Sequence, residues 1–306
     1  MARGRMPRKE KSEKKVTRYT YDEIKEPRTP ETGHTSLLPA DEARVPAATQ
    51  ALLYGVGVFE TFRARRGQVY RLDRHYERLE RGALTLSIPV PLSAGELADS
   101  VAALVRRAGL DDARLRLTLA AGATDADSIC LITIRGVEEY PESLYAQGVA
   151  AVIASVWRNE SSPLARLKSL NYLDNLLARR AALQAGAWDA ILLNSQGFVA
   201  EASASNVFAV ENGRLVTPRI DDGALPGVTR AAVMDLAAAA GLAVEERQLS
   251  ASDLLAADEL FFTNAVAGVL PLVSLDGRPI AAGSPGEVTR RIRRLYEAAV
   301  WSGAGN

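Results

Sequence analysis

Apolar runs of strand length are the feature that most constrains the fold of this chain of 306 residues. Residues 129–134 and 149–154 are almost continuously apolar, which is typical of strands buried on both faces. Residues 114–119 alternate instead, with leucines at every second position, and this indicates a strand with one buried face. Apolar residues at helical spacing occupy the segment 72–86. The chain is therefore expected to fold as a mixed α/β or α+β protein.

Several further elements can be predicted with their ends. Ser93 and Glu96 form the pattern of a capping box, and Gly109 stands where that helix would end. Asn212-Gly213 is typical of a two-residue hairpin turn. We also expect helices over residues 172–185, 229–240 and 285–300 and strands over 190–193, 198–200, 206–210, 214–216, 259–263 and 269–273.

Composition divides the chain into three parts. Residues 1–40 are rich in charge, Pro, Thr and Gly and poor in large apolar side chains, so we interpret them as a flexible basic and polar extension. The globular remainder divides near Trp157. The expected domains are thus residues 41–156 and residues 157–306.

The overall balance of charge argues against several classes of partner. Lys plus Arg and Asp plus Glu both number 37, so nothing pulls the chain toward nucleic acid or an anionic membrane. Cys130 is the single cysteine, which excludes an internal disulfide and makes a reducing compartment, the cytoplasm, the expectation. No apolar run has the length of a membrane span, and no His/Cys/Asp spacing suggests a metal. A small-molecule substrate is the remaining expectation.

A pair of glycines occurs in Tyr54-Gly55-Val56-Gly57-Val58-Phe59-Glu60. Glu60 occupies the place of the third glycine that a dinucleotide-binding turn requires. Taken alone, the pair therefore predicts only a tight turn at the start of a strand.

A more specific pattern lies in the second half of the chain. It consists of an acid, an Asn with two apolar residues after it, a strand, and a Gly-apolar-Thr-Arg turn. The segments are Glu201-Ala202-Ser203-Ala204-Ser205-Asn206-Val207-Phe208, Leu215-Val216-Thr217 and Leu225-Pro226-Gly227-Val228-Thr229-Arg230. This pattern resembles the signature of the class IV aminotransferases, the pyridoxal-phosphate (PLP) enzymes of fold type IV.

Other blocks extend the resemblance to about residues 42–298. They are 54–79, Leu167-Lys168-Ser169-Leu170-Asn171-Tyr172-Leu173 and Phe261-Phe262-Thr263-Asn264-Ala265. The resemblance implies a smaller N-terminal α/β domain, a larger C-terminal pseudo-barrel domain and a homodimer with the site near its interface.

The resemblance also implies which residues hold the cofactor. Lys168 would carry PLP as a Schiff base, and a lysine can do so only when its amine is neutral, which desolvation favours. Glu201 would face the pyridine nitrogen, since an anion keeps that nitrogen protonated and the ring a good electron sink. The expected contacts to the phosphate and the rest of the ring come from Arg71, Tyr172, Val228, Thr229, Asn264 and Ala265. Tyr172 could equally be a core residue.

Substrate contacts are expected from both halves. In the strand 114–119, Arg116 faces away from the leucines, and with Arg158 it is a candidate for binding carboxylates. Either arginine could also be an ordinary solvated residue. Tyr54 and Phe59 are the other expected substrate contacts, whereas His75 is expected to be structural.

The choice of reaction depends on two positions. Thr61 stands where branched-chain aminotransferases tend to have glycine, and Asn264 is similar to the residue found in 4-amino-4-deoxychorismate lyases. We therefore expect a lyase that forms 4-aminobenzoate and pyruvate, a step of folate biosynthesis, with Lys168 and Thr61 as catalytic residues. The alternative is an aminotransferase acting on branched-chain or D-amino acids. A binding protein without activity is disfavoured because the lysine block is intact.

Overall fold

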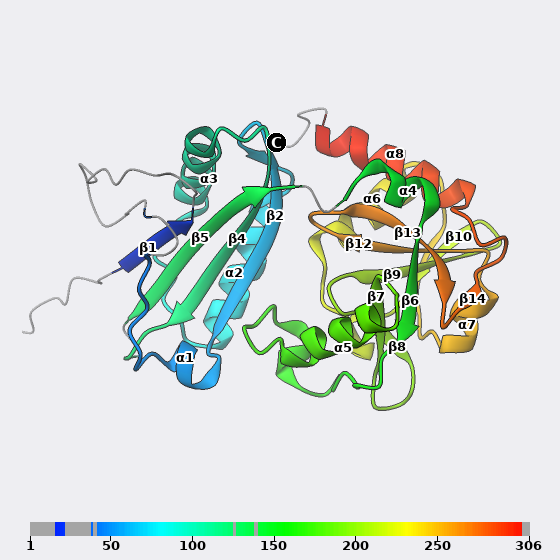
Figure 1. Ribbon diagram of the computed structural model, residues 1–306, viewed down its shortest axis with the longest axis horizontal. Coiled ribbons are helices and arrows are strands. Elements are labelled where there is room, and N and C mark those ends of the chain that lie inside the picture. Colours follow the sequence, from blue (N-terminus) through cyan, green and yellow to red (C-terminus); the bar gives the residue numbers. More distant parts are fainter. Residues whose placement is uncertain (1–15, 22–37, 39–41, 125–126, 138–139, 302–306) are drawn as a thin grey trace, which may run out of the picture.

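The structure, a computed structural model, is built around two β-sheets that lie side by side (Figure 1). It describes residues 16–21, 38, 42–124, 127–137 and 140–301. Both sheets are covered by helices, so the mixed fold predicted from the sequence is confirmed.

The first sheet has five strands and belongs to the N-terminal half. In order across the sheet they are β1 (Val16–Tyr21), β5 (Ser128–Gly136), β4 (Asp112–Ala121), β2 (Gly57–Arg65) and β3 (Gln68–Val69). β1 pairs in parallel with β5, while the other neighbours are antiparallel.

β1 lies within the segment 1–40 that the sequence predicts to be a flexible extension. The structure adds residues 16–21 to the open edge of the first sheet. Their sequence, VTRYTY, is rich in β-branched and aromatic residues, a strand signal that the charged surroundings conceal in a composition average. The other residues of the segment lie outside the described residues, apart from Leu38.

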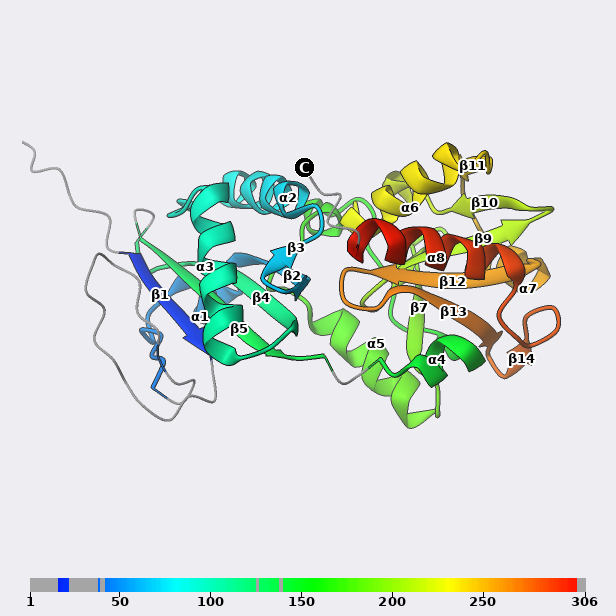
Figure 2. The same cartoon turned by 90° about the horizontal axis from the view of Figure 1, so that it is seen from above.

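Helices cover one face of the first sheet (Figure 2). They are α2 (Leu72–Thr85) and α3 (Ala94–Ala108), while the short α1 (Gln50–Tyr54) precedes β2. The leucines of the alternating strand are fully buried in the core beneath these helices. The capping box of Ser93 and Glu96 and the end of α3 at Gly109 are confirmed.

The second sheet is larger and curls around its own core (Figure 1). In order its strands are β11 (Val244–Glu246), β10 (Arg214–Thr217), β9 (Asn206–Glu211), β12 (Glu259–Asn264), β13 (Gly268–Leu275), β6 (Val149–Ile153), β7 (Asp189–Leu193) and β8 (Val199–Ala202). β14 (Arg278–Pro279) pairs with β13. The predicted hairpin joins β9 and β10, with Asn212 and Gly213 both at positive φ.

One strand belongs to a different sheet from the one that the sequence suggests. β6 falls within the expected first domain, but it pairs with β13 and β7 of the second sheet. The chain therefore passes between the sheets after β5 and before α4 (Glu142–Gln147). An apolar run predicts a buried strand but does not say in which sheet it is buried.

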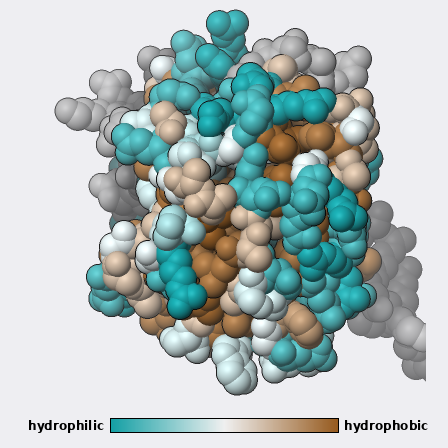
Figure 3. Space-filling model, turned by 90° about the vertical axis from the view of Figure 1, so that its right-hand side faces the viewer, coloured by the Kyte–Doolittle hydropathy of each residue, from teal (hydrophilic) through white to brown (hydrophobic). Residues whose placement is uncertain are grey.

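The remaining helices surround the second sheet. α6 (Val228–Ala239) and α8 (Glu287–Trp301) pack on one face, α5 (Leu173–Gln184) packs against β7, and α7 (Ala251–Ala256) lies near the outer end. Two short 3-10 helices are η1 (Pro163–Arg166) and η2 (Ile220–Asp222). From the side of this sheet the surface is largely hydrophilic, with hydrophobic residues showing near its centre (Figure 3). Among the described residues no helix has the length and apolar character needed to span a membrane.

Candidate active site

A cavity of about 500 Å³ lies between the two sheets and collects most of the residues singled out in the sequence. Those that line it are Phe59, Thr61, Arg116, Lys168, Tyr172, Glu201, Val228, Thr229, Asn264 and Ala265. Tyr54, Arg71 and Arg158 do not line it. Of the described residues, no group of three or more His, Cys, Asp or Glu is placed to hold a metal ion.

Lys168 is fixed by β2, an inner strand of the first sheet. Its carbonyl oxygen accepts the backbone N–H of Phe59 at 2.8 Å, and two residues later the N–H of Leu170 donates to the oxygen of Gly57 at 2.9 Å. A Cβ on Gly57 would lie 2.6 Å from Leu170 Cδ1 and 2.9 Å from the backbone oxygen of Leu119, so a larger residue would force β2, β4 and the lysine segment to shift. Gly55 ends α1 in the left-handed region, with φ of 69°. The glycine pair thus forms a turn and a docking surface for the lysine segment.

The environment of Lys168 favours a neutral amine. Burial, assisted by the positive charge of Arg78, lowers the pKa of Lys168 to about 8. The Nζ atom lies 4.5 Å from the centre of the Phe59 ring and 5.6 Å from that of Tyr172. An amine with this pKa is available as a nucleophile near neutral pH, as attachment of an aldehyde requires.

Glu201 lies at the opposite side of the cavity in β8. Its Oε2 atom accepts the backbone N–H of Leu225 at 2.9 Å, and its Oε1 atom lies 3.2 Å from Arg158 Nη2. Burial raises the pKa of Glu201, while Arg158 opposes this rise. A buried carboxylate with one ionic partner can interact with a protonated ring nitrogen.

Arg158 therefore contacts Glu201 and does not line the cavity. Its guanidinium also donates to the oxygen of Gly223 at 3.3 Å, to that of Ala165 at 2.9 Å and to Asn175 Oδ1 at 3.2 Å. Because these groups and Glu201 occupy the donors of Arg158, the structure does not support the prediction that Arg158 binds a carboxylate of the substrate. The sequence could not distinguish the two roles, since both require a buried arginine near an anion.

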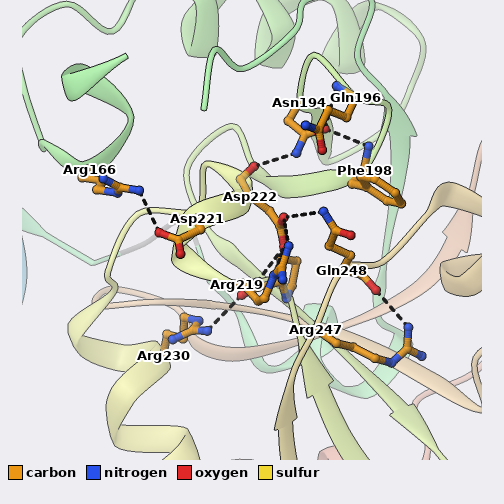
Figure 4. A network of polar contacts seen from close by, with 11 residues as sticks. Arg166, Asn194, Gln196, Phe198, Arg219, Asp221, Asp222, Arg230, Arg247 and Gln248 are labelled. Carbon is orange, nitrogen blue, oxygen red and sulfur yellow. Dashed lines mark hydrogen bonds and ion pairs between the residues drawn. The ribbon is translucent and has the colours of Figure 1, made fainter. Parts of the chain in front are cut away.

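The loop that carries Leu225 is held by a polar network around Asp222 (Figure 4). The carboxylate of Asp222 accepts from Arg219 at 2.9 Å and from Gln248 at 3.0 Å, and its backbone oxygen accepts from Asn194. Arg230 of α6 donates to the oxygen of Pro218. These contacts fix the segment that presents the Leu225 N–H to Glu201 and leads into α6.

The first turn of α6 opens on the same cavity, where it could receive the phosphate. Val228 and Thr229 are its first residues, and free N–H groups at a helix start attract a phosphate. The neighbouring turn is shaped by Asn264, whose Oδ1 accepts the N–H groups of Val266 and Ala267 at 2.9 and 2.8 Å. Lys168, Glu201 and the start of α6 together fit the aldehyde, the pyridine nitrogen and the phosphate of PLP.

Arg71 is placed outside this arrangement. It precedes α2 in the left-handed region, and its Nη1 atom forms an ion pair with Asp235 of α6 at 2.9 Å. Arg71 does not line the cavity, so its described contacts give no support to the expected contact with the phosphate. Tyr172 lines the cavity and donates to the oxygen of Ser203 at 2.9 Å, and burial raises the pKa of its hydroxyl, which keeps it protonated.

The first sheet contributes a row of arginines, of which the sequence singles out Arg116 and sequence reasoning missed the others. Strand register places Arg114 opposite Arg63 on one side and Arg135 on the other. Thr61 and Arg116 form the next cross-strand pair. Arg114, Arg116 and Arg135 all line the cavity, together with Arg179 of α5. Register between distant strands carries no signal in one sequence, so only the fold could bring this row together.

A lysine with a lowered pKa, a buried acid and a helix start around one cavity fit a PLP enzyme. Comparison with known proteins agrees: the family described as amino-transferase class IV matches residues 57–275. The chain belongs to the class IV aminotransferase family, and its fold is that of the type IV PLP enzymes.

Individual relatives carry two different activities in their names. A Methanocaldococcus jannaschii protein, provisionally named branched-chain-amino-acid aminotransferase, is 37% identical over 266 residues and covers 84% of this chain and 91% of its own length. The aminodeoxychorismate lyase of Bacillus subtilis is 34% identical over 257 residues, and the match covers 80% of this chain and 86% of its own length. The crystal structure of the T.th. branched-chain amino acid aminotransferase with pyridoxamine 5′-phosphate has a TM-score of 0.82 and 30% identity, covering 88% of this chain and 92% of that chain.

Proposed function

We propose that the enzyme is a lyase that converts 4-amino-4-deoxychorismate to 4-aminobenzoate and pyruvate. The observation that carries this proposal is the charge of the cavity. Among the described residues that line it, Glu201 is acidic, whereas six are basic: Arg78, Arg114, Arg116, Arg135, Lys168 and Arg179. The proposed substrate carries two carboxylates, while a branched-chain amino acid carries one carboxylate and an aliphatic group.

The position of Arg116 supports an anionic ligand. Its guanidinium carbon lies 3.7 Å from the centre of the Phe59 ring, and its Nε donates to Thr118. Burial and then the neighbouring charge of Arg114 lower the pKa of Arg116. A carboxylate placed between these two arginines would relieve the repulsion that lowers it.

We assign the proton transfers to two side chains, Lys168 as the base and Thr61 as the proton donor. The bound cofactor supplies an electron sink. Lys168 removes the proton from the ring carbon that bears the amine, the bond from the ring to the ether oxygen breaks, and the ring becomes aromatic. The products together contain every atom of the substrate.

The alternative is an aminotransferase for branched-chain or D-amino acids. It is supported by the names of several relatives of this chain, which are branched-chain aminotransferases. An aminotransferase stops after one half-reaction unless an amino acceptor is present, whereas a lyase does not. This difference separates the two functions without any assumption about affinity.

The test incubates holoprotein with 4-amino-4-deoxychorismate and no 2-oxo acid. We expect many turnovers, measured as the fluorescence of 4-aminobenzoate and as equal amounts of pyruvate. In parallel, L-leucine and D-alanine are each supplied with 2-oxoglutarate. Inert aminodeoxychorismate combined with steady transamination of either amino acid would refute the lyase.

Replacement of Thr61 tests the assigned proton donor. Thr61→Val keeps the shape of the side chain and removes only the hydroxyl, so we expect the lyase rate to fall about 10²-fold with an unchanged cofactor spectrum. Thr85→Val, at an exposed threonine of α2 outside the cavity, is the matched control and should retain the rate. An unchanged rate in Thr61→Val would mean that another group delivers the proton.

We also propose a homodimer that acts in the cytoplasm. Tyr54 is 72% exposed on α1, beside exposed Leu52 and Leu53, and α5 exposes Leu173 and Leu176. Asn171 connects the two helices through a hydrogen bond to Gly55, and Leu176 also lines the cavity, so this apolar surface continues to the site. A second copy of the chain would cover it. Light scattering should give a mass twice that of the chain. In Leu53→Glu the measured mass should fall to that of a single chain.

A further inference from the structure

A second cavity, of about 300 Å³, lies next to the first and takes no part in the proposed chemistry. Lys168, Thr61 and Glu201 do not line it. The two cavities share a wall, because six described residues line both: His75, Tyr140, Val228, Thr229, Ala265 and Val266. This shared wall includes the first turn of α6 and the turn after Asn264, so the second cavity lies behind the place proposed for the phosphate of PLP.

Aromatic side chains from separate parts of the fold surround the second cavity. They are Phe62 of β2, Tyr70 before α2, Tyr140, Tyr145 of α4 and Tyr296 of α8. The rings of Tyr70 and Tyr296 meet edge to face, with their centroids 5.9 Å apart. Burial raises the pKa of Tyr145 and that of Tyr296 to about 12, so both hydroxyls stay protonated near neutral pH. The rings therefore offer apolar, uncharged surface to a flat ligand, and the volume is at the lower end of the range for small-molecule sites.

The charges of the described residues around the second cavity cancel. The basic residues are Arg63, Arg65 and Arg293, and the acidic residues are Asp112, Glu142 and Glu297. Arg63 Nε donates to Asp112 at 2.6 Å, and Arg293 donates to the two oxygens of Glu142 at 2.8 and 2.6 Å. The first cavity attracts anions with its six basic side chains and one acid. A charged ligand in the second cavity would instead compete with an existing ion pair.

The shared wall also contains a hydrogen-bond acceptor that the fold does not use. His75 is 2% exposed, and burial lowers its pKa, so its ring is neutral. Burial alone would raise the pKa of Glu60, but the charge of Arg78 and the bonds from His75 and Arg78 hold it at about 2. His75 Nδ1 lies 2.7 Å from Glu60 Oε2 and therefore donates to this ionised carboxylate. Nε2 is then an acceptor, and no described residue donates to it, so an N–H group of a ligand would satisfy this atom.

We propose that the second cavity binds a flat, uncharged aromatic molecule that carries an N–H donor, and that its occupant strengthens the binding of PLP. The aromatic lining selects the ring, the balanced charges select against a net charge, and His75 accepts the N–H. The site is separate from the proposed lyase reaction, so failure of the lyase assay would leave the inference intact.

Side chains of the second cavity hold the shared wall from behind. Tyr145 donates its hydroxyl to the oxygen of Ala267 at 2.8 Å, and Arg63 Nη1 donates to the oxygen of Val266 at 3.2 Å. On the other side of the same turn, Asn264 and Ala265 line the first cavity. A molecule packed among these side chains restrains them and, through them, the turn that faces the phosphate. Because coupling between two ligands is reciprocal, PLP should strengthen binding at the second cavity by the same factor, for which we expect about fivefold.

The experiment uses three probes of nearly the same shape: benzamide, which is uncharged and has an N–H donor, the anion benzoate and the cation benzamidine. Each is titrated into holoprotein and followed by ligand-detected NMR. Val300 of α8 lines the second cavity and not the first, so Val300→Trp fills the second alone, and the binding lost in this variant is the binding at that site. We expect benzamide to bind there at least about tenfold more tightly than either charged probe. Ala298→Trp, on the exposed surface of the same helix, is the matched control and should bind benzamide normally.

A second filling variant and the affinity for PLP complete the test. Val69→Phe fills the cavity from β3, the opposite side, and should abolish benzamide binding even if Val300→Trp does not fold. Saturating benzamide should lower the dissociation constant of PLP about fivefold, and the filling variants should not show this change. No binding of benzamide, binding that survives both substitutions, or equally tight binding of benzoate at this site would overturn the site. A dissociation constant of PLP that benzamide leaves unchanged would overturn the coupling.

Discussion

The two walls of the cavity are built in different ways. The wall from the first sheet consists of side chains in the middle of strands, such as Thr61, Arg114 and Arg116, whose positions follow from strand register. The wall from the second sheet uses loops and element ends, such as the first turn of α6 and the turn at Asn264. In the proposed enzyme, backbone N–H groups of the second wall would hold the phosphate of the cofactor, while side chains of the first wall would face the substrate. Substitutions in the first wall should change which substrate is bound. Substitutions in the second wall should change the rate of turnover.

The largest effect is expected at Lys168, whose backbone is attached to β2 of the first wall. Lys168→Ala should lose covalent attachment and lower turnover by at least about 10³-fold, because the amine is both the attachment point and the base. After borohydride reduction, mass spectrometry should find the pyridoxyl group on Lys168 in the unmodified chain and nowhere in the variant. A label on another lysine would show that the wrong residue has been assigned.

The same lysine gives a pH dependence. Because its pKa is lowered to about 8, capture of pyridoxal by apo protein should rise through that pH, well below the ordinary lysine value of 10.5. Between these two values the unfolded chain binds more protons than the folded one, so apo stability should increase with pH in this window. Chemical denaturation of apo protein and of Lys168→Met at several pH values measures the difference. A midpoint near 10.5 would contradict a buried amine.

Glu201 comes next and tests the second wall. Glu201→Gln keeps the shape but removes the charge that faces the pyridine nitrogen, so turnover should fall about 10²-fold while PLP still binds. Its spectrum and dissociation constant are measured by titration of apo protein. Glu77→Gln, an exposed acid on α2, serves as the control. Normal turnover in Glu201→Gln would indicate that a different acid faces the ring.

The arginine row tests the first wall. Arg114→Met and Arg135→Met should each raise KM for a dicarboxylate substrate about tenfold and leave PLP affinity unchanged, since one charge-assisted contact is lost. Arg107→Met on the exposed surface of α3 should change neither value. If both variants lower the affinity for PLP and leave KM unchanged, the assignment of substrate binding to the first wall and cofactor binding to the second is wrong.

The smallest effect is expected at the edge of the first sheet. Deleting residues 1–40 removes β1, but the cavity lies on inner strands, so PLP affinity and turnover should be retained. We expect Tm to fall by less than about 4 °C. An insoluble truncated protein would show that β1 protects the edge of β5.

Much of this arrangement could be predicted from the sequence, for reasons visible in particular residues. The cap of α3, the hairpin at Asn212-Gly213 and the leucine face of β4 are local patterns, and each was confirmed. Contacts that depend on pairing between distant segments were not predictable. The roles of Arg158 behind Glu201 and of Arg114 in the arginine row depend on which strands become neighbours.

The clamp between Gly57 and Leu170 has a consequence for how the molecule opens. The lysine segment, although later in the chain, pairs with β2, so Lys168 is attached to the first sheet. Glu201 and the start of α6 belong to the second. A cofactor bound to Lys168 and to the start of α6 would therefore connect the two sheets. Holoprotein should melt as a single cooperative unit, whereas apo protein can open along the seam between its sheets.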